Sequence, residues 1–141
     1  MILVHQFSGI SKNGWKYCRE HMTQPYLSNA AYDICGVILQ FKESNQDNVA
    51  KALKMDKSSV AKIINKCVLD GLIERQVNPD NRREYILRLT EKGKMIVQEL
   101  VDLVEQWQQE ALSALDEKEQ EVFLQMLEKI KVKTDLMADQ K

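Results

Sequence analysis

The stretch that most constrains the fold runs from Asp56 to Gly93, where a polar helix is followed by two short strands joined by a basic loop. Asp56 or Ser58 can cap the helix, because a short side-chain oxygen accepts hydrogen bonds from the N–H groups of a first helical turn. Gly71 can end it, since glycine adopts a left-handed backbone conformation without strain. A helix followed by a two-stranded ribbon with a basic tip can contact two parts of a DNA duplex at once.

The predicted helix has an apolar face and a polar face. Apolar side chains recur at helical spacing and are expected in the core: Val60, Ile63, Ile64, Cys67 and Val68. Polar and basic side chains occupy the other side: Ser58, Ser59, Lys62, Asn65 and Lys66. After the turn, residues 73–77 and 85–89 are predicted strands. In the second strand three residues are expected to alternate toward the core: Tyr85, Leu87 and Leu89.

The loop between the strands, residues 78–84, is longer than a tight hairpin needs, and long loops are more often functional. It carries three turn-forming residues followed by two adjacent arginines: Pro79, Asp80, Asn81, Arg82 and Arg83. The loop is therefore predicted to present positive charge at the tip of the ribbon.

These motifs resemble those of the MarR family of winged-helix transcriptional regulators. The wing pattern of the family corresponds to Asn81-Arg82-Arg83 and Leu89-Thr90-Glu91-Lys92-Gly93. Its recognition-helix pattern corresponds to Ser58-Ser59-Val60-Ala61-Lys62, and its turn into the first wing strand to Asp70-Gly71-Leu72-Ile73-Glu74-Arg75. The resemblance is strong over Gln46 to Gly93 and extends to the whole chain in length and element order.

The sequence departs from the family pattern at two positions. Asn81 stands where the family has an aspartate, although Asp80 is adjacent. Asn65 stands where the family has an acidic residue late in the recognition helix, so an ion pair from there to Arg75 cannot form. Arg75 shares a strand face with Ile73 and Val77, which favours a structural role for it over DNA contact.

Helical spacing and caps predict the elements on either side. A helix is expected within residues 1–24, followed by a break at Pro25. Ser28 can cap a second helix, with an inward face of Ala31, Ile34, Cys35, Ile38 and Phe41. Further helices are expected to start at Ser44 or Asn45, at Thr90, and at Asp116, where Glu119 completes a capping-box pattern.

The predicted fold is mainly α with a small antiparallel β wing, in one compact fold. Residues 28–93 would form the winged helix-turn-helix DNA-binding region, and residues 1–27 and 94–141 would serve dimerisation. The two C-terminal helices carry more apolar surface than one small winged helix can cover. This surplus and the family resemblance favour a homodimer over an intramolecular helical hairpin.

The formal net charge of −1 conceals an asymmetry along the chain. Residues 1–50 hold 4 basic and 4 acidic side chains, residues 51–94 hold 11 and 6, and residues 95–141 hold 5 and 11. The segment with the predicted helix and wing therefore has a net charge of +5, and the last segment −6. Such a local basic excess is the expected footprint of a phosphate-binding surface, and the alternative is a solvated charged face.

Seven residues are candidate DNA contacts: Lys57, Ser58, Ser59, Lys62, Lys66, Arg82 and Arg83. Lysines on the polar helix face can contact phosphates or guanine edges, and serines at a helix start can bind phosphate or base. The family resemblance implies that Arg83 enters the minor groove, whose negative potential attracts a guanidinium group. Arg82 is expected to bind backbone phosphate or to pair with Asp80. For the helix residues the alternative is an ordinary solvated surface.

Two further groups near the N-terminus have a functional and a structural interpretation. The first group could line an effector cleft, as in family members that bind aromatic or lipophilic ligands: Trp15, Tyr17, His21, Tyr26 and Tyr32. Core aromatics are the alternative. Cys18 could act as a redox switch, because some relatives sense peroxides in this region, and packing is the alternative. Cys35 and Cys67 lie on apolar faces and are predicted core residues.

Several classes of protein receive no support. No nucleophile-base set, phosphate loop or metal-ligand spacing is present, so we expect no enzyme activity, cofactor or metal. Three cysteines without paired spacing argue against a disulfide framework and for a reducing cytoplasm. No apolar run approaches the length of a membrane span, and Met1 to Val4 is too short for a signal sequence.

The combined prediction is a homodimeric, sequence-specific, DNA-binding transcriptional regulator. It would bind a pseudo-palindromic double-stranded operator as a repressor and be released by a small aromatic or lipophilic effector. Two alternatives remain open: a redox-sensing regulator that uses Cys18, and a winged-helix module that binds protein instead of DNA.

Overall fold

The computed structural model describes residues 2–24 and 27–139. These described residues form six helices and two strands, which in chain order are α1 (Leu3–His21), α2 (Asn29–Phe41), α3 (Gln46–Leu53), α4 (Lys57–Leu69), β1 (Ile73–Val77), β2 (Tyr85–Leu89), α5 (Glu91–Leu112) and α6 (Glu117–Ala138). The chain divides into two compact units, of which the first ends at Val104 and the second begins at Glu105. The boundary lies inside α5, later in the chain than the predicted start of the C-terminal region at residue 94.

Side-chain caps begin the helices where the sequence predicts them. Ser28 caps α2, and of the two candidates for α3 it is Asn45 that accepts the hydrogen bond. Asp56 caps α4 by accepting from the backbone N–H of Ser59. Asp116 and Glu119 form a reciprocal capping box at the start of α6. These contacts need only residues three apart, which explains why the sequence reveals them.

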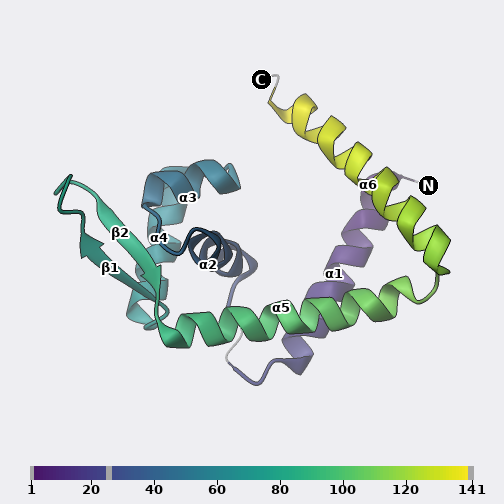
Figure 1. Ribbon diagram of the computed structural model, residues 1–141, viewed down its shortest axis with the longest axis horizontal. Helices are drawn as coiled ribbons and strands as arrows, with labels where there is room; N and C mark the ends of the chain where they lie inside the picture. Colours follow the sequence, from purple (N-terminus) through teal and green to yellow (C-terminus); the bar gives the residue numbers. More distant parts are fainter. Residues whose placement is uncertain (1, 25–26, 140–141) are drawn as a thin grey trace. The chain divides into compact units, whose positions relative to one another are not determined.

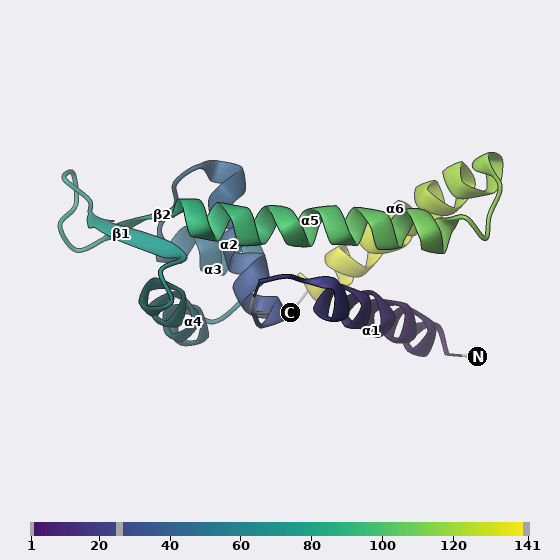
Figure 2. The same ribbon diagram turned by 90° about the horizontal axis from the view of Figure 1, so that it is seen from below.

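The end of α4 fixes the direction of the wing. Gly71 has a φ of 73°, as predicted. Its N–H donates to the carbonyl of Val68, and the N–H of Leu72 donates to that of Cys67. This Schellman pairing satisfies the last helical carbonyls and turns the chain into β1. The wing then extends from the end of α4, away from the helices of the first unit (Figures 1 and 2).

The wing is a two-stranded antiparallel sheet in which Ile73 pairs with Leu89 and Val77 with Tyr85. Leu87 and Leu89 are buried as expected, but Tyr85 is 50% exposed. The expectation for Tyr85 is therefore wrong. The buried end of the sheet lies against the helices, while the paired residues Val77 and Tyr85 lie at its far end, where no core is present to cover them.

The core of the first unit is formed by apolar residues from α1 to α5 and both strands. Its most deeply buried large side chains include Ile34, Ile38, Ile64 and Leu72. Phe41 was expected to continue the inward face of α2, but it is 59% exposed. It occupies the last position of the helix, so helical spacing alone does not ensure that a neighbouring element covers it.

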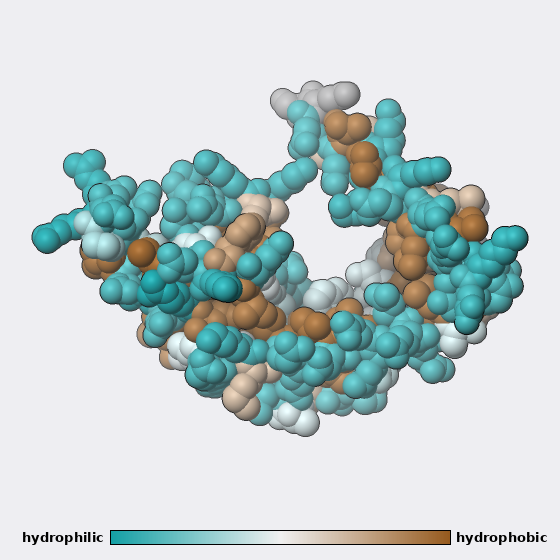
Figure 3. Space-filling view, in the orientation of Figure 1, coloured by the Kyte–Doolittle hydropathy of each residue, from teal (hydrophilic) through white to brown (hydrophobic). Residues whose placement is uncertain are grey.

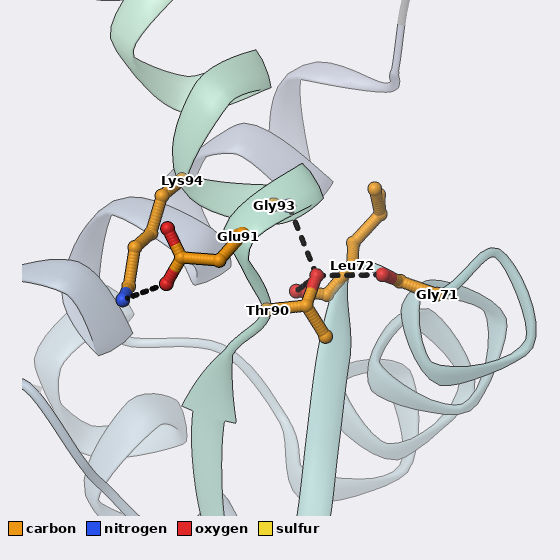
Figure 4. Close-up of polar contacts among 6 residues, drawn as sticks. All are labelled: Gly71, Leu72, Thr90, Glu91, Gly93 and Lys94. Carbon is orange, nitrogen blue, oxygen red and sulfur yellow. Dashed lines mark hydrogen bonds and ion pairs between the residues drawn. The ribbon is translucent and has the colours of Figure 1, made fainter.

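A close backbone approach joins the wing to α5 (Figure 4). The hydroxyl of Thr90 donates to the carbonyl of Gly71 at 2.6 Å and accepts from the N–H of Gly93 at 3.0 Å, which caps α5 as predicted. The backbone N–H of Thr90 donates to the carbonyl of Leu72 at 3.0 Å. A Cβ atom on Gly93 would lie 2.2 Å from that carbonyl oxygen. Glycine is therefore required here by space.

The second unit contains the end of α5 and the whole of α6. No residue of α6 is buried. Hydrophobic surface is visible along this helix (Figure 3), and its large exposed apolar side chains include Val122, Phe123, Met126, Ile130, Leu136 and Met137. A single chain thus leaves an apolar face of α6 in contact with water. Within the described part of the chain, no helix combines the length and apolar character that crossing a membrane requires.

Candidate nucleic-acid interface

The N-terminus of α4 is organised by Asp56. Its carboxylate accepts from the hydroxyl of Ser58 at 2.7 Å and from the backbone N–H of Ser59 at 2.9 Å. Hydrogen bonds from Ser59 and Ser58 lower the pKa of Asp56 to about 2, so the cap is anionic at neutral pH. Ser58 is exposed and Ser59 is half-buried. Of the two serines, Ser58 is therefore the one that can reach a ligand outside the helix.

The three candidate lysines of α4 are all exposed. Lys57 pairs with Asp47 at 3.2 Å, and Lys66 pairs with Asp70 at 3.0 Å. Exposed pairs of this kind contribute about 0–1 kcal/mol, so a phosphate group can replace the carboxylate at little cost. Lys62 and Lys66 lie one helical turn apart on the same face.

The wing tip holds its two arginines on an ordered turn. The side chain of Asn81 accepts from the N–H of Arg83 at 3.2 Å, and that of Asn78 accepts from the N–H of Asp80 at 3.0 Å. The backbone N–H of Asn78 donates to the carbonyl of Glu84 at 3.0 Å and closes the loop. The side chains of Arg82 and Arg83 are exposed at this tip.

Two arginines of the wing, Arg75 and Arg88, connect it to the rest of the first unit. The guanidinium group of Arg75 donates to the side-chain oxygen of Asn65 in α4, and it also lies 5.4 Å from the ring centroid of Tyr85. Arg88 donates to Glu43 at 2.6 Å and to Gln76 at 2.8 Å. Sequence patterns did not point to Arg88 or Glu43, because these residues are 45 positions apart and no local pattern pairs them.

Comparison with known proteins shows which proteins this chain resembles in sequence and in fold. Residues 27–84 match the model described as MarR family. The HTH-type transcriptional regulator BilQ of Clostridium symbiosum is 31% identical over 86 residues, which are 61% of this chain and 60% of that protein. A crystal structure of MarR matches with a TM-score of 0.82 at 23% identity, over 100% of this chain and 96% of that one. Residues 27–84 are thus similar to the MarR family, and the fold is that of the MarR crystal structure.

A second solved MarR-family structure is informative because of its partner. It is a crystal structure of a MarR mutant from E. coli complexed with operator DNA. Its TM-score is 0.76 at 20% identity, and the match covers 91% of this chain and 92% of that one. At this level of identity the match establishes the winged-helix fold. The region matched by the BilQ regulator spans less than two thirds of that protein's length.

The two departures from the MarR-family pattern both have a structural replacement. The side-chain oxygen of Asn81 accepts a hydrogen bond within the wing turn, as an aspartate oxygen does in an Asx turn. Asn65 cannot form an ion pair with Arg75, but it accepts a hydrogen bond from it. A neutral acceptor replaces a charged one in each case, and the wing remains connected to α4.

A cavity with a volume of about 590 Å³ lies in the first unit. Residues of α2, α4 and α5, and of the segments beside them, line it, and three of these are lysines: Lys62, Lys66 and Lys92. Two of the three are candidate DNA contacts. The cavity is therefore adjacent to the face of α4 that the sequence assigns to DNA.

The predicted effector residues lie elsewhere. Trp15 stacks on Tyr32 with ring centroids 6.5 Å apart, and Tyr17 stacks on His21 at 4.0 Å. The Tyr32 hydroxyl donates to the sulfur of Met22 at 2.7 Å. None of these four candidates lines the 590 Å³ cavity. Tyr26 lies outside the described residues.

Cys18 is buried in the core of the first unit. Burial raises the pKa of its thiol, which opposes formation of the reactive thiolate. Both observations disfavour Cys18 as a redox centre and are consistent with a packing role. Cys35 and Cys67 are buried as predicted.

Proposed function

We propose that this chain is a homodimeric, sequence-specific, DNA-binding transcriptional regulator that acts as a repressor. The observation that carries the proposal is the joint exposure, in one unit, of the polar face of α4 and of Arg82 and Arg83 at the wing tip. The hydrogen bond between Asn65 and Arg75 links these two elements. The net charge of +5 in residues 51–94 supplies the attraction for phosphates.

In the proposed complex, α4 lies in the major groove. Ser58 and Lys62 then face base edges and phosphates, while Lys57, Lys66 and Arg82 neutralise backbone charge. Arg83 enters the adjacent minor groove, where a guanidinium group meets enhanced negative potential. The anionic cap Asp56 is held inside the first turn by its hydrogen bonds to Ser58 and Ser59, so it points at the helix's own N–H groups.

Dimerisation is proposed from the exposed apolar side chains of the terminal helices. In α1, Leu3, Val4 and Ile10 are more than half exposed, and in α6 no side chain is buried. Covering such surface is favourable by about 25 cal/mol per Å² of apolar area. A second copy of the chain would cover these faces and would supply a second recognition helix for a pseudo-palindromic operator.

Release by a small effector is proposed from the cavity beside α4. Its apolar lining includes Ile63, Leu72 and Ile96, which suits a small aromatic or lipophilic molecule. Lys62 and Lys66 also line it, so an acidic group on that molecule would pair with two lysines that DNA requires. Binding of the effector and of DNA would then compete through the same side chains.

The test begins with selection of DNA fragments by the purified protein, followed by affinity titrations at fixed salt. Arg83→Ala should weaken binding to the selected operator by roughly 1–3 kcal/mol without unfolding the protein, because a groove-inserted guanidinium is removed from an exposed tip. Lys118→Ala, in the second unit, is the matched control and should leave affinity unchanged. Failure to enrich any sequence, or equal affinities for Arg83→Ala and the parent chain, would contradict the proposal and favour a protein-binding winged helix.

A further inference from the structure

Asn65 lies on the same exposed stripe of α4 as Ser58 and Lys62. It follows Ser58 by seven residues and Lys62 by three. Because an α-helix has about 3.6 residues per turn, these spacings place the three side chains within about 60° of one another around the helix axis. All three residues are exposed. In the proposed complex this stripe faces the major groove, so Asn65 is within reach of base edges although the sequence patterns did not single it out as a DNA contact.

Arg75 of β1 fixes which way the Asn65 amide points. The guanidinium group of Arg75 donates a hydrogen bond to Oδ1 of Asn65, and the nearby Tyr85 ring restrains the arginine from its other contact. A guanidinium group has only donors, so the amide oxygen must face it, and turning the amide over would bring two donor groups together. Among the described residues, none accepts a hydrogen bond from Nδ2 of Asn65. The amide nitrogen is therefore the atom that remains for a ligand.

This fixed orientation changes which base the side chain can recognise. An unrestrained asparagine pairs with adenine through both amide atoms, because its oxygen accepts from N6 and its nitrogen donates to N7. Here the oxygen is held by Arg75, so that pairing through both atoms is lost and only the N–H donors face outward. Guanine presents two acceptors in the major groove, N7 and O6. Cytosine presents its N4 amino group, a donor that would meet the donors of Asn65.

We propose that Asn65 is a specificity-determining residue that selects guanine at one position of each operator half-site, and that Arg75 acts as its positioning residue. The inference rests on the proposed function, since it requires α4 in the major groove. The acidic residue of the MarR-family pattern at this position would have only acceptors and would favour cytosine instead. Asn65 thus keeps the link between α4 and the wing while it changes the base that is selected.

The experiment selects double-stranded DNA from a random pool with the full-length parent chain, Asn65→Asp and Asn48→Asp. The parent should require guanine at one half-site position. Asn65→Asp should enrich cytosine there, because one carboxylate oxygen can keep Arg75 while the other accepts from cytosine N4. In titrations at fixed salt, each of these two proteins should bind its own operator on the order of tenfold more tightly than the other's. Asn48→Asp makes the same charge change on an exposed residue of α3 and should keep the base preference of the parent.

A second variant, Arg75→Met, tests the positioning role. It removes the guanidinium group and lets the Asn65 amide turn, so the preferred base should change from guanine to adenine, and circular dichroism checks that each variant is folded. A purely structural link would lower affinity for all sequences without changing the preferred base. Base preferences in Asn65→Asp and Arg75→Met equal to those of the parent would overturn this inference and leave the proposed function standing. Failure of the parent chain to enrich any sequence would refute the proposed function and this inference together.

Discussion

Replacing Gly93 by alanine tests the joint between the wing and α5. The added Cβ would lie 2.2 Å from the carbonyl oxygen of Leu72 and 3.1 Å from its carbon. Both belong to the backbone, so no side-chain rotation relieves the clash. That carbonyl accepts from the N–H of Thr90, whose hydroxyl in turn caps α5. The strand and the helix must therefore separate, and the hydrogen bonds between them lengthen.

The magnitude follows from three contributions. Overpacking against a fixed neighbour costs about 1–3 kcal/mol. Weakening one or two of the Thr90 hydrogen bonds adds about 0.5–1.5 kcal/mol each. Replacing glycine in a helix recovers up to about 1 kcal/mol. We expect Gly93→Ala to lower the free energy of unfolding by about 2–3 kcal/mol.

Urea denaturation followed by circular dichroism at fixed protein concentration measures this change. The control is Gly36→Ala in α2, where an added Cβ meets nothing within 4 Å. That substitution should raise stability by roughly 0.5–1 kcal/mol, because alanine is the better helix former. A midpoint for Gly93→Ala equal to or above that of the parent chain would show that the close approach imposes no constraint and would refute the reasoning.

Three further outcomes are expected. The logarithm of DNA affinity should fall linearly with the logarithm of salt concentration. Lys66→Gln should flatten this slope by about 0.9 for each phosphate that is no longer neutralised, for random and specific DNA alike. An unaltered slope would show that Lys66 does not neutralise a phosphate. Asn65→Ala should remove the hydrogen bond that joins Arg75 of the wing to α4. We expect operator binding to weaken by about 1 kcal/mol, with little effect on the free energy of unfolding. Equal affinity at fixed salt would argue against this link. Sedimentation should find a dimer at micromolar concentration, and the selected half-sites should lie roughly 10 base pairs apart; a stable monomer would contradict the proposed assembly.

The charge distribution bears on how such a dimer could approach DNA. Residues 95–141 carry 5 basic and 11 acidic side chains, a net charge of −6 per subunit. This charge would repel a duplex if it lay beside the contact surface. Our proposal therefore requires the acidic terminal helices to lie away from the DNA, with the basic segment facing it. The salt dependence tests this requirement, because a slope near zero would mean that few phosphates are neutralised.

Local sequence patterns were sufficient to predict the helices and strands and the residues at which most of them begin or end. Ser28, Asp56 and the pair Asp116 and Glu119 cap helices as predicted, and Gly71 has the positive φ expected of a helix end. Each of these features depends on hydrogen bonds between residues only a few positions apart. The apolar spacing of α2 and α4 likewise identified most buried residues, because helical geometry repeats along one element. The wing and its basic tip were recognisable for the same reason.

Contacts between distant residues depend on how the elements pack, and only the tertiary structure revealed them. Phe41 and Tyr85 continue apolar patterns but lie beyond the neighbours that would cover them. The bond from Arg75 to Asn65 replaces an ion pair that the sequence excluded without indicating a substitute. The position of a cavity likewise depends on the packing of several elements at once.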